Sequence, residues 1–283
     1  VCINLSNLYH TYEYSKETMR GKSELVKPDT HNQTKGGLER DYITQWSYGI
    51  GETFSLLVPN VKGGASVPLA ANEKAMEKAN PMYGSIYNQL GQYWGEQPGN
   101  VRSGVCRGQF VMFLFILGLF VVKGPMKWAL LAATVLSVLL SWGKNFMGFT
   151  DFFLDYIPMY DKFRAVSSIL VIAEFTIPLL AMLALKQIIA RPQIMKEQAK
   201  AFYISFGLTG GIALLFALAP RFFFPSYVSS MEMQALQSIP ADQLAPLIAN
   251  LEEVRVSIFT SDAWRSFFVV SIGGCAVVAL WHG

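Results

Sequence analysis

The stretch GKNFMGFTDFFLDYIPMYDKFRAVSS, residues 143–168, is a polar interruption between two apolar segments. The chain is apolar from residue 125 to 142 before this stretch and from residue 165 to 185 after it. The interruption combines acidic and basic side chains with many aromatic rings, and aromatic side chains are enriched where a membrane meets water. The sequence therefore predicts that residues 143–168 form a loop at a membrane surface.

The composition supports a membrane protein. Hydrophobic residues make up 52% of the 283 residues and charged residues only 15%, whereas soluble domains carry about 25% charged residues. The charges are concentrated in the first hundred residues, which indicates a polar N-terminal part followed by membrane segments. The net charge of +3 is too small to indicate a nucleic-acid partner, and the three cysteines are too widely spaced to match a metal pattern.

We expect a mainly α-helical, polytopic membrane protein with about five transmembrane helices and outward-facing polar loops. The expected segments are an extracytoplasmic loop region at 1–109, transmembrane helices 1–4 at 110–219 with an outward loop at 143–164, an extracytoplasmic excursion at 220–265, and the start of helix 5 at 266–283. The first apolar run, 110–122, is shorter than the roughly twenty residues that a span needs. The stretch before it, 99–109, is unusually basic and hydrophilic for a segment that leads into a membrane.

The basic residues predict an orientation. The two short connectors at 123–127 and 186–200 together hold six basic residues and one acidic residue. Since Lys and Arg collect on the cytoplasmic side, both connectors are expected in the cytoplasm. The N-terminal hundred residues, the loop at 143–168 and the excursion at 221–265 then face outward.

Residues 234–257 have the pattern of an amphipathic helix, because apolar side chains recur at steps of three and four. Such a helix could lie on the outer leaflet or pack on the N-terminal part. Its polar face is acidic and has little attraction for anionic lipid, which favours packing on the N-terminal part.

Glu174 lies about ten residues into its apolar segment, near the expected middle of the membrane, with Pro178 following it. An ionisable group at that depth often marks a functional site. The alternative is a protonated or hydrogen-bonded Glu with a purely structural role. Both interpretations stay open.

The loop at 143–168 offers two kinds of chemistry. Asp151 and Asp155 are spaced to share a helix face and could bind a divalent cation or act as a general base. The basic side chains Lys144, Lys162 and Arg164 could contact a lipid phosphate. The alternative is that these charges belong to a solvated loop with interfacial anchors, and for the two aspartates this alternative is favoured.

A compact block lies in the N-terminal part, with Trp46-Ser47, Glu52, Leu56-Leu57, Pro59-Asn60 and Gly63-Gly64. By composition it is an apolar segment that ends in a turn. The sequence contains no pattern of a catalytic triad and no nucleotide-binding glycine loop, so it gives no support to soluble-enzyme chemistry.

This block and the later stretch IPMYDKFR at 157–164 together resemble the YfhO family of bacterial polytopic membrane proteins. Their amino-acid sequence is similar to that of family members from Bacteroides-type bacteria. The resemblance implies a GT-C type membrane glycosyltransferase architecture in the bacterial cytoplasmic (inner) membrane. It implies a polyprenyl-phosphate-linked sugar as donor, an envelope glycan or lipid as acceptor, and membrane lipid as surroundings.

The resemblance also implies functional roles for Trp46 and Glu52, beside the basic residues of the later loop. The family's catalytic acid lies in an outward loop that would precede residue 1, so we expect the chain to be a fragment of a longer protein and carry over no catalytic aspartate. The sequence requires no cofactor beyond the divalent cation that the loop aspartates could bind. The alternatives are a transporter or flippase of an envelope precursor, with Glu174 as its site, and a non-catalytic envelope assembly factor.

Overall fold

A computed structural model describes residues 4–18, 32, 34, 38–64, 66–97, 108–158, 160–237 and 239–282. Within these residues the regular secondary structure is helical, and pairing between extended segments is limited to isolated bridges such as that of Pro68 with Gly91. The expected mainly α-helical class is therefore confirmed. Residues 99–107 of the basic stretch before the first apolar run lie outside the described residues.

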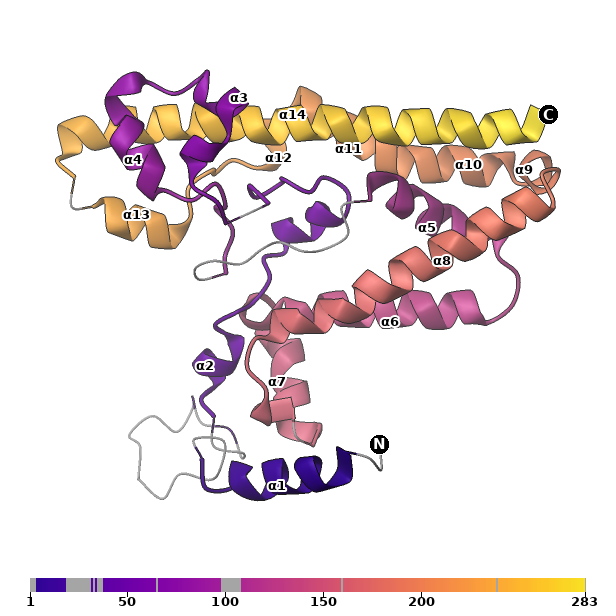
Figure 1. Ribbon diagram of the computed structural model, residues 1–283, viewed down its shortest axis with the longest axis horizontal. Helices are drawn as coiled ribbons and strands as arrows, with labels where there is room; N and C mark the ends of the chain where they lie inside the picture. The colour runs from indigo at the N-terminus through magenta and orange to yellow at the C-terminus, as the bar shows by residue number, and fades with distance from the viewer. Residues whose placement is uncertain are drawn as a thin grey trace. The chain divides into compact units, whose positions relative to one another are not determined.

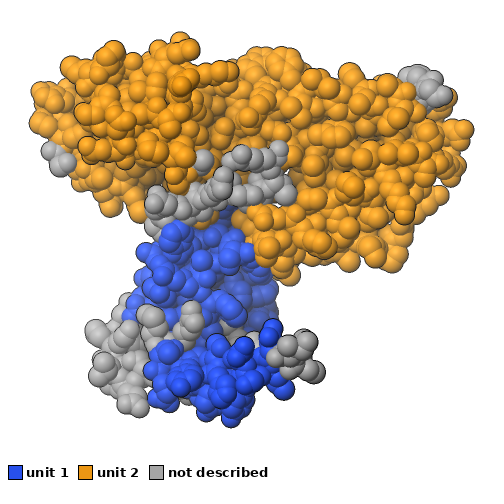
Figure 2. Space-filling model, in the orientation of Figure 1, with its two compact units in different colours: residues 1–48, 139–169 blue, residues 49–138, 170–283 orange. Residues whose placement is uncertain are grey.

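The chain forms two compact units (Figure 2). Unit 1 consists of residues 1–48 and 139–169, and unit 2 of residues 49–138 and 170–283. Each unit thus combines a piece of the polar N-terminal part with a later piece of the chain, a division that cuts across the segments expected from the sequence.

Unit 1 is built around the loop at 143–168, which is largely helical. Its elements are α1 (Leu5–Ser15), α2 (Arg40–Thr44), η5 (Gly143–Phe146), α7 (Met147–Tyr156) and η6 (Tyr160–Lys162). A small apolar core of Leu38, Ile43, Leu154 and Val166 joins α2 to the loop. Burial of these side chains from distant parts of the sequence is the main apolar stabilisation that holds α7 in place.

A tight turn fixes the start of this loop to the segment after α2. Gly143 has φ +43°, and a Cβ added there would lie 2.2 Å from the Ser47 Oγ. The Ser47 Oγ accepts a hydrogen bond from the Lys144 backbone N–H at 2.8 Å, and Tyr48 N–H donates to the Ser141 carbonyl. A glycine is required here because a side chain would occupy the place of the Ser47 hydroxyl.

Unit 2 holds most of the apolar helices, which are labelled in Figure 1. They are α5 (Gln109–Val121), α6 (Met126–Ser141), which continues into unit 1, α8 (Val171–Ala190), which follows η7 (Val166–Leu170) at the end of unit 1, α10 (Ala199–Phe206), the π-helical η8 (Gly207–Gly211), α11 (Ile212–Leu218) and α14 (Ala241–His282). α5 packs on α8, α10 and α14, around a core that contains Phe113, Phe202 and Val270.

Three helical segments in the described residues are long and apolar enough to cross a membrane, namely Val166–Ala190, Ala199–Leu218 and Asp242–Leu280. The pair Met126–Ser141 and Gly143–Tyr156 would make a fourth if it is counted as one broken span. α5, with 13 residues, falls short of the roughly twenty that a span needs. The apolar helices thus support a membrane protein, whereas the expected number of five spans is not confirmed.

α14 is a single helix of 42 residues, although the sequence predicted a polar excursion to residue 265 followed by a separate span. Its one proline, Pro246, lies in the second turn, so nothing interrupts the backbone hydrogen bonding where the break was expected. The N-terminal half buries Leu247, Leu251 and Val254 against small elements from the N-terminal part. The predicted packing of this amphipathic stretch on the N-terminal part is therefore confirmed.

Small elements complete unit 2. From the N-terminal part they are η2 (Gly51–Leu56), η3 (Leu69–Ala71), α3 (Glu73–Met76), η4 (Pro81–Tyr83) and α4 (Gly84–Gln89), and from later in the chain α9 (Ile194–Glu197), α12 (Pro220–Phe223) and α13 (Ser230–Leu236). Tyr83 and Tyr87 of this group are buried in the same core as Leu251. The first half of α14 is thus the platform on which residues 49–97 fold.

Gly207, Gly210 and Gly211 lie in the π-helical turn η8. A Cβ at Gly207 or Gly211 would meet nothing within 4 Å, so no neighbouring helix approaches closely at these two glycines. Close approach occurs at Gly273, where a Cβ would lie 2.1 Å from the Phe110 ring.

Candidate functional site

Glu52 is a buried carboxylate on η2, with 2% of its surface exposed. Its Oε1 accepts a hydrogen bond from the Glu96 backbone N–H at 2.5 Å and another from the Tyr93 hydroxyl at 2.8 Å. Two donors on one oxygen fix the position of the carboxylate and satisfy part of the hydrogen bonding that it loses on leaving water.

Gly95 makes this arrangement possible. A Cβ at Gly95 would lie 2.0 Å from the Glu52 Oε1 and 2.1 Å from the Tyr93 hydroxyl. The backbone between Tyr93 and Glu96 therefore passes very close to the carboxylate, which is possible because residue 95 is a glycine and has no side chain.

Burial shifts the pKa values of two opposite charges in this region. Burial raises the pKa of the Glu52 carboxyl, and its hydrogen bonds from Glu96 and Tyr93 offset part of the rise. Burial lowers the pKa of the Lys62 ammonium, and the negative charges of Glu52 and Glu96 offset part of the fall. A buried base and a partly desolvated cation are the kind of pair that occurs at catalytic sites.

Both groups line one cavity of about 260 Å³. Its polar side consists of Glu52, Lys62 and Glu96, and Gly49 and Gly51 contribute backbone. Its apolar side is a cluster of rings from η2, α11 and the end of α12, namely Phe54, Phe216, Phe223 and Phe224. The Lys62 Nζ lies 5.7 Å from the centre of the Phe224 ring, a distance at which a cation is attracted to the ring face.

The rest of the block at 46–64 builds this cavity. Gly63 and Gly64 have φ +84° and +71°, a left-handed turn that reverses the chain directly after Lys62. The Asn60 backbone N–H donates to the Asp262 Oδ2 on α14 at 2.7 Å, and Leu57 is buried against α11 and α14. The turn predicted from Pro59 to Gly64 is therefore present, and it places Lys62 opposite Glu52.

Unit 1 brings together Trp46 and Arg164, both of which the family resemblance singled out. The Arg164 guanidinium lies 4.6 Å from the centre of the Tyr42 ring and 5.9 Å from that of the Trp46 ring. It also donates hydrogen bonds to the Tyr42 hydroxyl at 3.2 Å and to the Gln45 Oε1 at 3.1 Å. Arg164 is exposed, so this cation with two aromatic rings lies at the surface of the unit.

The two loop aspartates share one partner that the sequence did not single out. The Arg40 guanidinium donates from Nη1 to Asp151 and from Nη2 to Asp155 at 2.8 Å. Asp151 and Asp155 do lie on one face of α7, as their spacing predicted. Their carboxylates tie α7 to α2, and the described residues contain no group of three His, Cys, Asp or Glu side chains that could hold a metal ion.

The remaining predicted residues lie apart from the cavity. Lys144 is exposed in η5 and Lys162 is half-buried in η6, both in unit 1. Glu174 is half-buried in the first turn of α8, because the α-helix begins at Val171. Within the apolar span Val166–Ala190, which also includes η7, Glu174 is the ninth residue, in agreement with its expected depth of about ten residues.

Sequence reasoning missed Tyr93, Gly95 and Glu96, which follow Glu52 by about forty residues and belong to no recognisable pattern. It also passed over Lys62, although this residue lies inside the block between Asn60 and Gly63. A charged residue within a turn that is rich in glycine could have been noticed. Comparison of the chain with protein-family models, with curated proteins and with solved structures gave no match.

Proposed function

We propose that the chain belongs to a multi-pass protein of the bacterial cytoplasmic membrane, similar to the YfhO family, that works as a GT-C type glycosyltransferase. It would move a sugar from a polyprenyl-phosphate donor to an envelope glycan or lipid acceptor. The observation that carries the proposal is the cavity in which Glu52 and Lys62 face an aromatic wall.

The cavity offers each group that such a transfer needs. The Glu52 carboxylate accepts the proton of the acceptor hydroxyl as that oxygen forms its bond to the anomeric carbon of the donor sugar. The bond from the anomeric carbon to the phosphate oxygen breaks, and the phosphate leaves with the electron pair. The Lys62 ammonium stabilises the negative charge of the leaving phosphate.

The aromatic side of the cavity suits the lipid part of the donor. Phe223 and Phe224 belong to the segment that directly follows the apolar span Ala199–Leu218. A polyprenyl chain that leaves the membrane at this point would meet apolar rings before its phosphate reaches Lys62. The raised pKa of Glu52 makes it a stronger base than an exposed glutamate, as general base catalysis near neutral pH requires.

The other predicted residues take supporting parts in this proposal. Arg164, with Trp46 and Tyr42, combines a cation and rings at the surface of unit 1, a composition suited to lipid headgroups. The family resemblance gives the catalytic acid to a different loop, whereas this proposal gives the role of base to Glu52, the buried carboxylate that lines the cavity. The transporter alternative would rely on Glu174, which lines neither of the two cavities described for unit 2.

The proposal is tested by complementing a strain from which the gene has been deleted. The complementing genes are wild type, Glu52→Gln and Lys62→Met, and the controls are Glu73→Gln and Lys74→Met, which change exposed residues of α3. We expect the deletion to remove one sugar from the envelope glycans and wild type and both controls to restore it. Loss of a general base costs about 10²–10⁴-fold in rate, so Glu52→Gln should leave the sugar absent at equal protein level.

Mass spectrometry of the envelope glycans gives the outcome. Unchanged glycans in the deletion strain would contradict the transferase proposal, and loss of uptake of a solute in the same strain would favour the transporter. Full restoration of the sugar by Glu52→Gln would show that the cavity takes no part in the reaction.

A further inference from the structure

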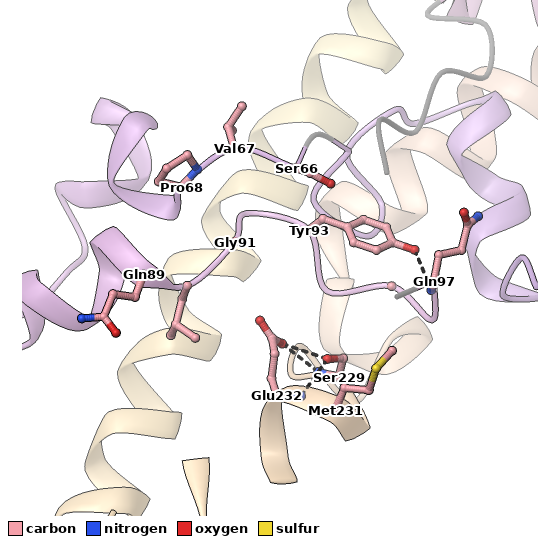
Figure 3. A pocket seen from close by; sticks show the side chains of 12 residues that line it. Ser66, Val67, Pro68, Gln89, Gly91, Tyr93, Gln97, Ser229, Met231 and Glu232 are labelled. Atoms are coloured by element: carbon pink, nitrogen blue, oxygen red, sulfur yellow. Dashed lines mark hydrogen bonds between the residues drawn. The ribbon is translucent and has the colours of Figure 1, made fainter. Parts of the chain in front are cut away.

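Unit 2 contains a second cavity, of about 320 Å³ (Figure 3). It is bounded by the bridge between Pro68 and Gly91 on one side and by the start of α13 on the other. Its volume is at the lower end of the roughly 300–1,000 Å³ that small-molecule sites enclose. It therefore suits a ligand of one or two small rings.

The lining of this cavity is nearly uncharged and combines a larger apolar surface with several polar side chains. Its polar side chains include Gln89, Gln97, Ser229 and the Tyr93 hydroxyl, beside the apolar Val67 and Met231. Amides and hydroxyls both donate and accept hydrogen bonds, which matches the hydroxyl groups of a sugar. The residues found to line the cavity include no lysine or arginine, so the lining does not favour a phosphate.

Glu232 is the charged residue of this lining, and its carboxylate is held firmly. Its Oε2 accepts from the Ser229 backbone N–H at 3.0 Å in a capping box at the start of α13. Arg255 of α14, whose side chain is fully buried, donates to both carboxylate oxygens. Oε1 accepts from the Arg255 Nη2 at 2.5 Å, and an ionised carboxylate oxygen can accept a further hydrogen bond from a ligand hydroxyl.

The two cavities are linked through Tyr93. Tyr93 and Gly95 line the second cavity, while the Tyr93 hydroxyl donates to the Glu52 carboxylate in the first. The same hydroxyl accepts from the Gln97 backbone N–H at 3.2 Å, as Figure 3 shows. A ligand in the second cavity therefore lies one side chain away from the proposed base.

We propose that the second cavity binds a neutral sugar residue of the acceptor. The inference rests on the proposed function, because the acceptor is the substrate whose hydroxyl must reach Glu52. The face of the Tyr93 ring packs on the C–H groups of the sugar, and Gln89, Ser229 and Glu232 bind its hydroxyls. The first cavity then holds the lipid phosphate and the second the acceptor sugar, on opposite sides of residues 93–95.

Binding is measured with the full chain in lipid nanodiscs by saturation-transfer difference NMR. The probes are the methyl glycosides of glucose, galactose, mannose and N-acetylglucosamine, with glucose 1-phosphate as the charged comparison. Met231→Trp fills the cavity from an exposed position, and Gln89→Ala removes one amide. Gln243→Ala, an exposed glutamine on α14, is the matched control.

We expect at least one neutral glycoside to receive saturation in wild type and Gln243→Ala. The transfer should be lost in Met231→Trp and weakened about fivefold in Gln89→Ala, as the loss of one hydrogen bond predicts. Absence of transfer to every neutral glycoside would overturn the inference, and so would preference for glucose 1-phosphate or unchanged binding by a folded Met231→Trp.

Lys62→Met separates this inference from the proposed function. It removes the proposed phosphate contact, so it should abolish sugar transfer while leaving glycoside binding unchanged. Glycoside binding in a protein whose deletion leaves envelope glycans intact would support the sugar site and contradict the transferase. Absence of glycoside binding by a protein whose deletion alters the envelope glycans would support the transferase and contradict the sugar site.

Discussion

At the scale of single residues, Glu52 matters most for the proposed function, because it is both buried and ionisable. Burial raises its pKa above the ordinary value of 4.5, so the folded protein binds this proton more tightly than the unfolded chain does. Proton binding by Glu52 stabilises the folded state fully below the pKa that Glu52 has in the unfolded chain. This contribution is lost as the pH rises through the pKa that Glu52 has in the folded protein. Glu52 therefore makes the fold less stable towards neutral pH.

Glu52→Gln should change this pH dependence. The amide keeps an oxygen for the Glu96 N–H and the Tyr93 hydroxyl but cannot titrate, so the unfolding temperature of the variant should fall less than that of wild type as the pH rises from 4.5. Thermal unfolding in detergent across this pH range measures the difference. Glu73→Gln should follow the wild-type curve, and a Glu52→Gln curve parallel to wild type would contradict the assigned pKa shift.

Arg255 is the other residue whose removal should be costly. It is fully buried, pairs with Glu232, and donates to the carbonyls of Tyr227 and Gly91. Removing one partner of a buried ion pair costs about 3–5 kcal/mol, so Arg255→Met should lower the free energy of unfolding by about that amount. Denaturant unfolding measures it, with the exposed Lys74→Met as control, and a loss below about 1 kcal/mol would show that the pair is dispensable.

At the scale of elements, the segment from Tyr93 to Glu96 depends on the absence of a side chain at Gly95. Gly95→Ala should displace both the Tyr93 hydroxyl and the Glu52 carboxylate, since a Cβ would lie about 2 Å from each. We expect a lower unfolding temperature together with reduced sugar transfer. Gly84→Ala is the control, because its Cβ would meet nothing within 4 Å, and α4 should become slightly more stable. Equal behaviour of the two variants would contradict the described packing.

The contact between α2 and α7 should depend on Arg40. Arg40→Gln leaves Asp151 and Asp155 as neighbouring like charges on one helix face, which is unfavourable. Because both carboxylates are more than a third exposed, the expected loss of stability is only about 1 kcal/mol. Limited proteolysis of unit 1 should show faster cleavage near α7, and the additional change Asp155→Asn should slow it again. Unchanged cleavage in Arg40→Gln would show that the pair does not hold α7.

Several elements could be predicted from the sequence and others could not. Long apolar runs and the repeat of apolar residues at 234–257 predicted helices, because burial of one helix face follows directly from spacing. The sequence did not predict that this helix continues to residue 282, since polar side chains can cover a long helix without interrupting it. Glu52 was indicated by its motif, whereas Tyr93 and Glu96 reach it only through the path of the folded chain.

At the scale of the whole molecule, the apolar helices and the basic connectors predict how the protein crosses its membrane. The segments 123–127 and 186–200 should lie in the cytoplasm and residues 49–97 outside. With the native cysteines replaced, Asn72→Cys should react with an impermeant maleimide added to intact cells. Lys196→Cys should react only after the cells are opened, and the opposite pattern would reverse the orientation and place Glu52 in the cytoplasm.

In the proposed function, Glu52 accepts the proton of the acceptor hydroxyl when the sugar leaves its polyprenyl-phosphate donor. The most direct measurement is the rate of sugar transfer by the purified full-length protein as a function of pH, for wild type and Glu52→Gln. We predict that the wild-type rate rises as the pH increases through the folded-state pKa of Glu52, above 4.5. Glu52→Gln should lose at least about a hundredfold in rate and lack that rise. A Glu52→Gln protein with the wild-type rate and pH profile would contradict the role of Glu52 as the base.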